Sequence, residues 1–352
     1  MRMEPLSVSP FVRSAGPSPA KTNKEAFTAS LTTARGNVAL SRTAATSTHD
    51  QNVMPHTPST ATPNPPPTIT NAAPSMEKNH TVTRLPTPVV LSALKRMLGN
   101  HEDANYFLSG FESGFCLGFN GIMTNIRSHN SASAKENPDQ VFEKVNNEIK
   151  LGRIAGPFPS PPFDPFICTP LALREKSTKG KFRLQHNLSY PYNNSAVNLN
   201  IPDSAASVSF DSPDRAFELL LPRPSCYLSK SDIADAFRLI PLHPSQYPLT
   251  GFSINGNYYY DKTLPMGARS ACRIFETFSS ALQDILVSRY YVQLTVKVPD
   301  DFFFIGDTKQ DCLFALECFR SLLQQHWCST SQTQNPPPHH EIDLLSNRPG
   351  HG

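Results

Sequence analysis

A change of composition near residue 85 restricts any folded domain to the later part of the chain. Residues 1–84 are dominated by Ser, Thr, Ala, Asn and Pro, and Thr57–Pro67 reads TPSTATPNPPP. Such a segment buries too little apolar surface to offset the entropy lost on ordering. We therefore expect a disordered leader over 1–84. A transit peptide is the weaker alternative, because the prolines oppose the amphipathic helix that it needs.

Residues 85–156 carry helical patterns and form the expected second region. Val89–Leu98 has an apolar stripe at helical spacing. Asn137 is a good N-cap, Pro138 suits the first helical position, and apolar residues then follow at intervals of four. A helical region in front of the main domain is therefore predicted.

Residues 157–325 become extended and then rich in strands with interleaved helices. We expect strands at Cys226–Ile233, Tyr291–Val298 and Phe302–Ile305, and a long helix over Ser270–Ser288. A shorter helix is expected to begin at Ser212-Pro213 and to run towards Leu221. Asn255-Gly256 favours a tight hairpin turn of type I′. The remaining residues, 326–352, are polar and rich in Pro and His, so an irregular tail is expected there.

Composition excludes several classes of protein. The net charge is +3, so a surface for nucleic acid must be local rather than global. The seven cysteines form no CxxC pair, which argues against a zinc site or a disulfide framework. The sequence has neither a signal-peptide core nor an apolar run long enough for a membrane span. An intracellular protein of the cytoplasm or nucleus, without a membrane partner, is expected; the oligomeric state is not legible.

Three aspartates stand out by their context. Asp232 ends a predicted strand in KSDIADAF, and Asp300 and Asp301 form the expected turn of VKVPDDFFFIG. Carboxylates from two converging elements can hold two hard divalent cations, which clamp the attacking and leaving oxygens of a phosphoryl transfer. Taken alone, an Asp-Asp pair is more often an ordinary turn.

Two further segments favour a catalytic role for these aspartates over an ordinary turn. One is Leu264-Pro265-Met266-Gly267, followed by the long amphipathic helix. The other is the basic stretch Arg174–Arg183, REKSTKGKFR, in which Gly180 suits a hairpin tip. Its cations would match triphosphate oxygens, although a basic solvated turn is the ordinary interpretation of such a stretch in isolation.

The order of these motifs resembles that of reverse transcriptases. The resemblance implies an α+β fold: a polymerase palm of antiparallel strands with helices on one face, fingers in front, and the disordered leader. It implies RNA-directed DNA synthesis on a primed RNA or DNA template from dNTPs, with two Mg²⁺ or Mn²⁺ ions. The implied catalytic and metal-binding residues are Asp232 and Asp300, as the principal metal ligands, and Asp301, as the second acid of the pair.

The same resemblance implies a nucleotide pocket. Lys176 and Arg183 would contact the triphosphate, and Phe237 would exclude a ribose 2′-hydroxyl, since an aromatic ring leaves no room for another oxygen. The other implied pocket residues are Asp235, Ala236, Met266 and Gly267.

Longer motifs are similar to the polymerases of tyrosine-recombinase retrotransposons of the DIRS and Ngaro type. They are Leu151–Phe163, Gly180–Pro191, Cys272–Leu282 and the upstream YFLSGFESGFCLGFNG. Pro299 departs from the family pattern, which has an aliphatic or other strand residue before the catalytic pair. It removes a backbone N–H from the strand that enters the catalytic turn.

The family's continuation after Gln325 is not found, so a copy truncated after the palm is expected. Two alternatives remain open: an inactive remnant that at most binds nucleic acid, and an RNA-dependent RNA polymerase, against which Phe237 argues.

Overall fold

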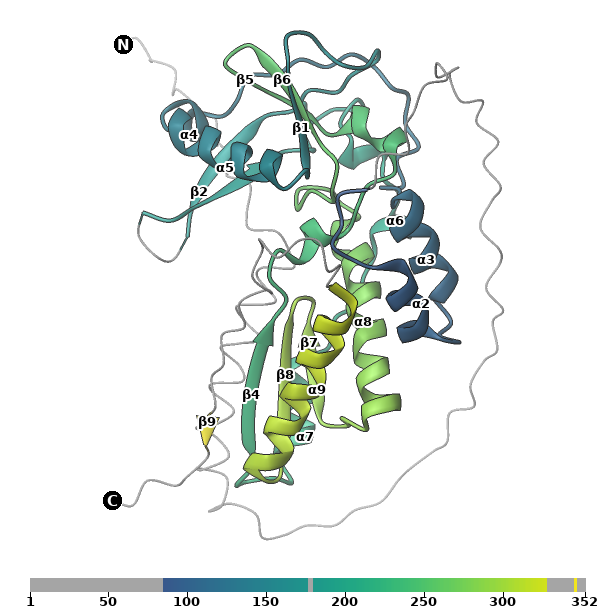
Figure 1. The fold of residues 1–352 in the computed structure, drawn as a ribbon. Helices are drawn as coiled ribbons and strands as arrows, with labels where there is room; N and C mark the ends of the chain where they lie inside the picture. The colour runs from purple at the N-terminus through teal and green to yellow at the C-terminus, as the bar shows by residue number, and fades with distance from the viewer. Residues whose placement is uncertain (1–84, 177–179, 328–344, 347–352) are drawn as a thin grey trace, which may run out of the picture.

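The computed structural model describes residues 85–176, 180–327 and 345–346; the expected leader, 1–84, lies outside them. The described chain combines helices with antiparallel sheets. Figure 1 shows one body built on the strands β4, β7 and β8 and a second body that contains β1, β2, β5 and β6.

The first body is a four-stranded antiparallel sheet in the order β7-β8-β4-β9. Its strands are β7 (Thr295–Val298), β8 (Asp301–Gly306), β4 (Tyr227–Asp232) and β9 (Leu345–Ser346). The first three strands agree with the sequence prediction within a few residues. The short β9 was not predicted: it pairs with Tyr227 and Leu228 of β4, in a region expected to be irregular.

Long helices cover one face of this sheet. Phe302 and Phe304 of β8 are fully buried and pack on Phe319 of α9 (Lys309–Trp327), with ring centroids 4.4 and 5.5 Å apart. Beside α9 runs α8 (Ala271–Tyr290), whose apolar residues belong to the same core. Because both helices present aromatic and aliphatic side chains at helical spacing, this face excludes water.

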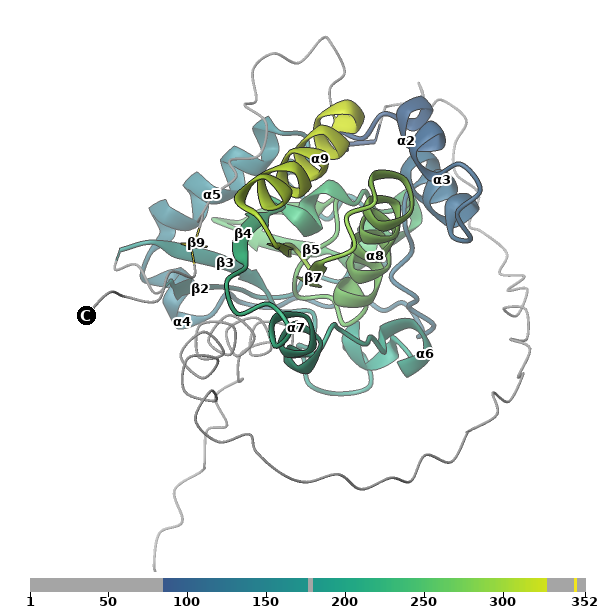
Figure 2. The same ribbon diagram turned by 90° about the horizontal axis from the view of Figure 1, so that it is seen from below.

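The prediction of helices on one face only was wrong. On the opposite face, α7 (Pro213–Leu220) packs on Val296, Val298 and Ile305, and Figure 2 shows the sheet between α9 and α7. The physical reason is that both faces of β8 carry apolar side chains, and each face needs a cover. The helix begins where predicted, since the Ser212 hydroxyl accepts from the N–H of Arg215.

The second body contains a three-stranded sheet, β1-β6-β5, and a hairpin. The sheet consists of β1 (Ile154–Phe158), β6 (Asn257–Asp261) and β5 (Gly251–Ile254), and the hairpin of β2 (Leu171–Glu175) and β3 (Phe182–His186). The turn between β5 and β6 has positive φ at Asn255 and Gly256, 49° and 79°, as the predicted type I′ turn requires.

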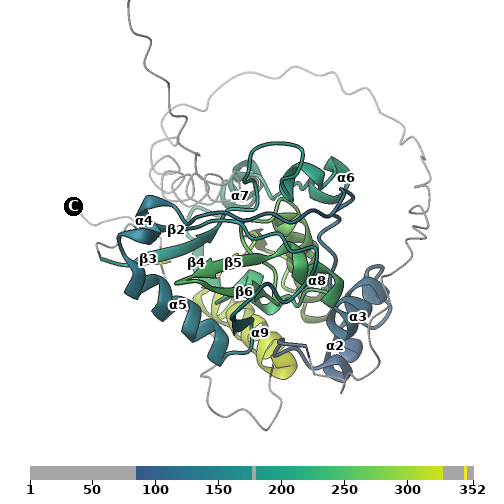
Figure 3. The ribbon, with the colours of Figure 1, turned by 90° about the horizontal axis from the view of Figure 1, so that it is seen from above.

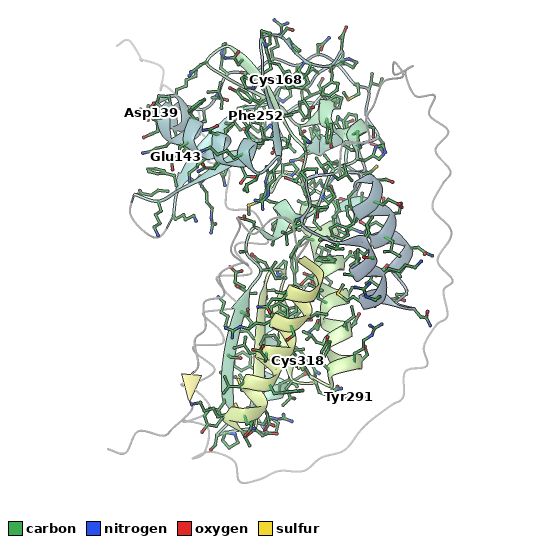
Figure 4. The ribbon with its side chains drawn as sticks, viewed as in Figure 1. Asp139, Glu143, Cys168, Phe252, Tyr291 and Cys318 are labelled. Carbon is green, nitrogen blue, oxygen red and sulfur yellow. The ribbon has the colours of Figure 1, made fainter. Side chains whose placement is uncertain are left out.

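Two helices flank this second body, α4 (Ala132–Lys135) and α5 (Pro138–Lys150). Figure 3 shows α5 running beside β2 and β3, and in Figure 4 Asp139 and Glu143 mark the outward side of α5. Val145 and Ile154 share a buried cluster with Phe252. The boundary expected after residue 156 thus falls inside β1, and α5 belongs with the strands that follow it.

The two bodies share a continuous core. At its edge lie α2 (Leu91–Leu98) and α3 (Ala104–Ser113), and Phe107 and Phe111 of α3 contact Phe278 of α8 edge-on at 5.6 and 5.3 Å. Short helical turns complete the described chain: η2 (Asn198–Asn200), α6 (Asp203–Ala206), η3 (Ala236–Leu239) and η4 (Pro244–Leu249).

Candidate active site

Asp232 and Asp301 occupy directly opposed positions on neighbouring strands. Asp232 ends β4, Asp301 begins β8, and the two residues are register partners. Opposed residues of an antiparallel pair project from the same face, with Cβ atoms about 4.5–5.5 Å apart. The two strands therefore bring two of the three predicted carboxylates to one place, the end of the sheet nearest the second body.

The turn between β7 and β8 consists of Pro299 and Asp300, because Val298 pairs with Asp301. Asp301 was expected in the turn, but it is a strand residue. Neither turn residue has a positive φ, which suits a type I turn with proline at its first central position. A ladder hydrogen bond is not needed from that position, so Pro299 fits the hairpin and does not damage its fold.

Two hydrogen bonds hold this turn. The Ile233 N–H donates to the Asp300 carbonyl at 2.9 Å, and the Ser279 hydroxyl of α8 donates to the Pro299 carbonyl. The turn that carries Asp300 is thus fixed both to β4 and to α8.

A lysine missed by the sequence analysis lies beside the carboxylates. Lys230, two residues before Asp232 and hence on the same face of β4, places Nζ 3.4 Å from Asp301 Oδ2 and 5.6 Å from the Phe303 ring centroid. Asp301 is 1% exposed, whereas the Lys230 side chain is 34% exposed. The period of two along a strand was the signal that could have revealed it.

A buried ion pair joins β7 to α8 next to this turn. Lys297 of β7 pairs with Glu276 of α8, and both side chains are buried. The Lys297 N–H donates to Asp211 Oδ2 at 3.0 Å. Burial raises the pKa of Glu276 to about 7, although Lys297 acts in the opposite direction. Neither residue was singled out in the sequence; a lysine inside the apolar run Val296–Val298 was the available signal.

Phe237, the residue predicted to exclude a ribose 2′-hydroxyl, lies with Asp235 and Ala236 in the turn after β4. Asp235 has a left-handed φ of 52°, and its carboxylate pairs with Arg153 Nη1 at 2.9 Å. Ala236 is buried. Phe237 is half-buried, and its ring lies 5.2 Å from that of Phe275 at a tilt of 36°. The Phe237 ring thus rests on the core and is partly accessible.

Gly267 lies against the end of strand β3, and Met266 directly precedes it. Met266 is 49% exposed. A Cβ on Gly267 would stand 1.9 Å from the His186 carbonyl oxygen, so only glycine allows this approach. Asn198 of η2 holds the loop that contains Gly267 and Arg269. Its Nδ2 donates to the Gly267 carbonyl at 2.8 Å, and its Oδ1 accepts from the Arg269 N–H.

The predicted cations stand on the β2–β3 hairpin, whose tip has Gly180 at a φ of 77°. Lys176 and Arg183 are both exposed, whereas Lys179 lies outside the described residues. The pKa of Lys176 is lowered by partial burial and then by Arg183, Lys144 and Lys181, while Asp235 raises it. Lys144 of α5 therefore adds to the positive charge around Lys176, and the carboxylate of Asp235 lies close enough to Lys176 to oppose that charge.

The carboxylates can supply only part of a metal site. In the part of the chain that the structure describes, no three His, Cys, Asp or Glu side chains are gathered into a metal-binding group. Mg²⁺ commonly takes one or two carboxylates and completes its shell with water and substrate phosphates. Asp232 and Asp301 on one face, with Asp300 in the adjoining turn, fit the protein's share of such a shell.

None of the helices in the described part of the chain combines the length and the apolarity that a bilayer crossing requires.

No protein-family model and no curated protein matches this sequence. Partial matches are found among solved structures. Native prototype foamy virus protease-reverse transcriptase matches over 58% of this chain and 24% of its own, at 22% identity and a TM-score of 0.43. Its selenomethionine-labelled CSH mutant matches over 68% and 32%, at 19% identity and a TM-score of 0.44.

The foamy viral protease-reverse transcriptase dRH, in complex with double-stranded DNA, matches over 71% of this chain and 44% of its own. Its identity is 17% and its TM-score 0.40. The present chain spans less than half the length of each of these three structures.

Proposed function

We propose that this chain carries the nucleotidyl-transfer centre of a reverse transcriptase of the tyrosine-recombinase retrotransposon type. The observation that supports it most is the opposed pair Asp232 and Asp301 beside the Pro299-Asp300 turn. In this proposal the four-stranded sheet with its helices is the palm, and the second body with its basic hairpin forms the fingers.

The proposed reaction joins a dNTP to a primer. The primer 3′-oxygen attacks the α-phosphorus, the bond to the β-phosphate oxygen breaks, and pyrophosphate leaves while the hydroxyl proton passes to solvent. Two Mg²⁺ or Mn²⁺ ions, when bound, would neutralise the charge on the reacting oxygens. Asp232, Asp300 and Asp301 would hold those ions; the chain itself contributes mainly orientation and fixed charge.

The nucleotide would lie between the hairpin and the end of β4. Lys176 and Arg183 supply cations for the triphosphate, and the exposed Met266 offers an apolar surface for the base. Phe237 would lie under the sugar, where its ring occupies the space of a 2′-hydroxyl. Asp235 and Ala236 would form the turn that presents Phe237.

A primer-extension assay tests the proposal and separates the alternatives. The chain is incubated with a primed RNA or DNA template, first with dNTPs and then with NTPs. Extension with dNTPs supports a reverse transcriptase, extension with NTPs alone supports an RNA polymerase, and no extension with retained nucleic-acid binding supports an inactive remnant. Asp300→Asn is the matched control, since it removes one charge at nearly constant shape and should abolish extension.

A further inference from the structure

A chain of charged side chains joins the second body to the turn that carries Phe237. Arg238 is its centre: its Nε lies 3.0 Å from Glu148 Oε2 of α5, and its Nη2 lies 2.8 Å from Asp261 Oδ1 of β6. Arg153 Nη1 continues the chain from Glu148, at 3.7 Å, to Asp235, at 2.9 Å. Asp235 and Arg238, the residues on either side of Ala236-Phe237, are therefore both ion-paired with side chains of the second body.

The other end of the chain reaches the basic hairpin. Asp261 Oδ2 lies 3.1 Å from Nδ1 of His186, the last residue of β3. His186 Nε2 lies 2.7 Å from Thr169 Oγ1 and 3.1 Å from the Gly251 carbonyl oxygen. The backbone carbonyl of this same histidine is the atom that Gly267 approaches so closely. Strand β3, the Met266-Gly267 loop and the Phe237 turn thus meet through one set of contacts.

Neighbouring groups of opposite charge keep Arg238 and Asp261 ionised, although both side chains are largely buried. Burial alone would lower the pKa of Arg238, but Asp261 and Glu148 outweigh it and raise that pKa. Burial would raise the pKa of Asp261, but Arg238 and the His186 hydrogen bond outweigh it and lower that pKa. A guanidinium that binds one carboxylate through Nε and another through Nη2 is fixed in orientation as well as neutralised in charge.

Such a network is a poor device for stability alone. Buried ion pairs cost desolvation that their attraction roughly balances, and apolar replacements of similar volume are often as stable. Their contribution is geometric, because a side chain held at two points has little freedom. Arg238 directly follows Phe237, and its N–H donates to the Asp235 carbonyl at 2.6 Å, so fixing Arg238 fixes the turn.

We propose that Arg238 is a positioning residue that, through Glu148 and Asp261, couples the basic hairpin to Phe237 and thereby sets sugar selectivity. This inference rests on the proposed function. Arg238 touches neither substrate nor metal in this scheme; it holds the ring that does the excluding. The Arg153–Asp235 pair secures the other side of the same turn.

The test uses the full chain and two network variants, Arg238→Met and the nearly isosteric Glu148→Gln. Glu143→Gln is the matched control, because Glu143 is an exposed acid on the same helix, on its outward side in Figure 4. A dideoxy-terminated primed template is titrated with dATP and with ATP in Mg²⁺, and the ratio of the two dissociation constants is measured. Hydrogen exchange of residues 180–186 and 233–240 is followed in parallel.

We expect both network variants to lower the preference for dATP by about tenfold, the change that a shift of roughly 1.4 kcal/mol produces. Exchange should quicken in both segments together, and Glu143→Gln should change neither quantity. An unchanged ratio with weaker binding of both nucleotides overturns the positioning role and leaves Arg238 structural. If the unmodified chain binds neither nucleotide, the proposed function and the selectivity role both fail. The exchange data then still show whether the hairpin and the turn are coupled.

Discussion

Lys230 and Asp301 form an ion pair across β4 and β8, with Nζ 3.4 Å from Oδ2, on the face that also carries Asp232. A lysine in this position places a positive charge beside the proposed metal ligands. The pair is partly exposed at Lys230, so solvent screens part of its energy.

Lys230→Met should tighten Mn²⁺ binding. Removing a competing cation favours the ion by roughly two- to fivefold, the range expected for an ion pair worth up to about 1 kcal/mol. Electron paramagnetic resonance of free Mn²⁺ measures the dissociation constant, and Lys150→Met, at an exposed site on α5, is the control. Weaker binding in Lys230→Met would show that the ammonium orders the carboxylates instead of competing with the ion.

The Glu276–Lys297 pair should show strong energetic coupling. Glu276→Met or Lys297→Met alone leaves an unpaired buried group and should cost about 3–5 kcal/mol of unfolding free energy. The double variant should cost less than either single change, as measured by urea unfolding. The exposed pair Arg215–Glu218, at 3.2 Å, provides a comparison in which coupling should stay below about 1 kcal/mol. Additive costs for Glu276 and Lys297 would contradict the account.

Stability should fall with rising pH through the range in which Glu276 titrates. Its folded pKa of about 7 lies above the ordinary value of 4.5, so the folded chain holds this proton more tightly than the unfolded chain. The resulting stabilisation is complete below about pH 4.5 and is lost as pH rises through 7. Its full size is on the order of 3 kcal/mol.

Urea unfolding from pH 4 to 8, compared between the unmodified chain and Glu276→Gln, isolates this contribution from the other carboxylates. The unmodified chain should lose stability relative to the variant as pH rises. A difference that stays constant with pH would mean that Glu276 has the same pKa in the folded and the unfolded chain.

Local signals in the sequence predicted much of this fold. Asn255-Gly256 fixed a hairpin turn, and Ser212-Pro213 marked the start of α7, because each acts through its own backbone. The opposed placement of Asp232 and Asp301 required only that two apolar strands pair. Asp301 was nevertheless assigned to the turn, although Pro299, a residue favoured at the first central position of a type I turn, was the local signal for Pro299-Asp300 as the two central residues.

The charged contacts could not be predicted in the same way. Arg238 meets Glu148 from 90 positions away, and His186 meets Asp261 across 75. Such pairs depend on how two bodies dock, and an arginine or histidine read alone is more often a surface residue. The helix α7 was predicted, but its position on the opposite face of the sheet was missed, because the alternating pattern of β7 does not show that both faces are buried.

Gly267→Ala should disturb the junction between β3 and the Met266-Gly267 loop. The new Cβ would overlap the His186 carbonyl, a backbone atom that cannot rotate away. We expect a loss of about 1–3 kcal/mol, the usual cost of overpacking, and faster hydrogen exchange over residues 186–189. Gly152→Ala is the control: its Cβ meets nothing within 4 Å, and its φ of +70° alone should cost about 1–2 kcal/mol. Exchange at 186–189 that is equal in the two variants would count against the proposed contact.

The central claim is that Asp232, its opposed partner Asp301 and the turn residue Asp300 form the protein's share of a two-ion nucleotidyl-transfer site. Mn²⁺ binding, counted by electron paramagnetic resonance with a dideoxy-terminated primed template and the matching dNTP, tests it without requiring turnover. The account predicts two ions per chain, and loss of at least one in Asp232→Asn with the unfolding free energy nearly unchanged. Identical Mn²⁺ binding by the unmodified chain and Asp232→Asn would contradict it.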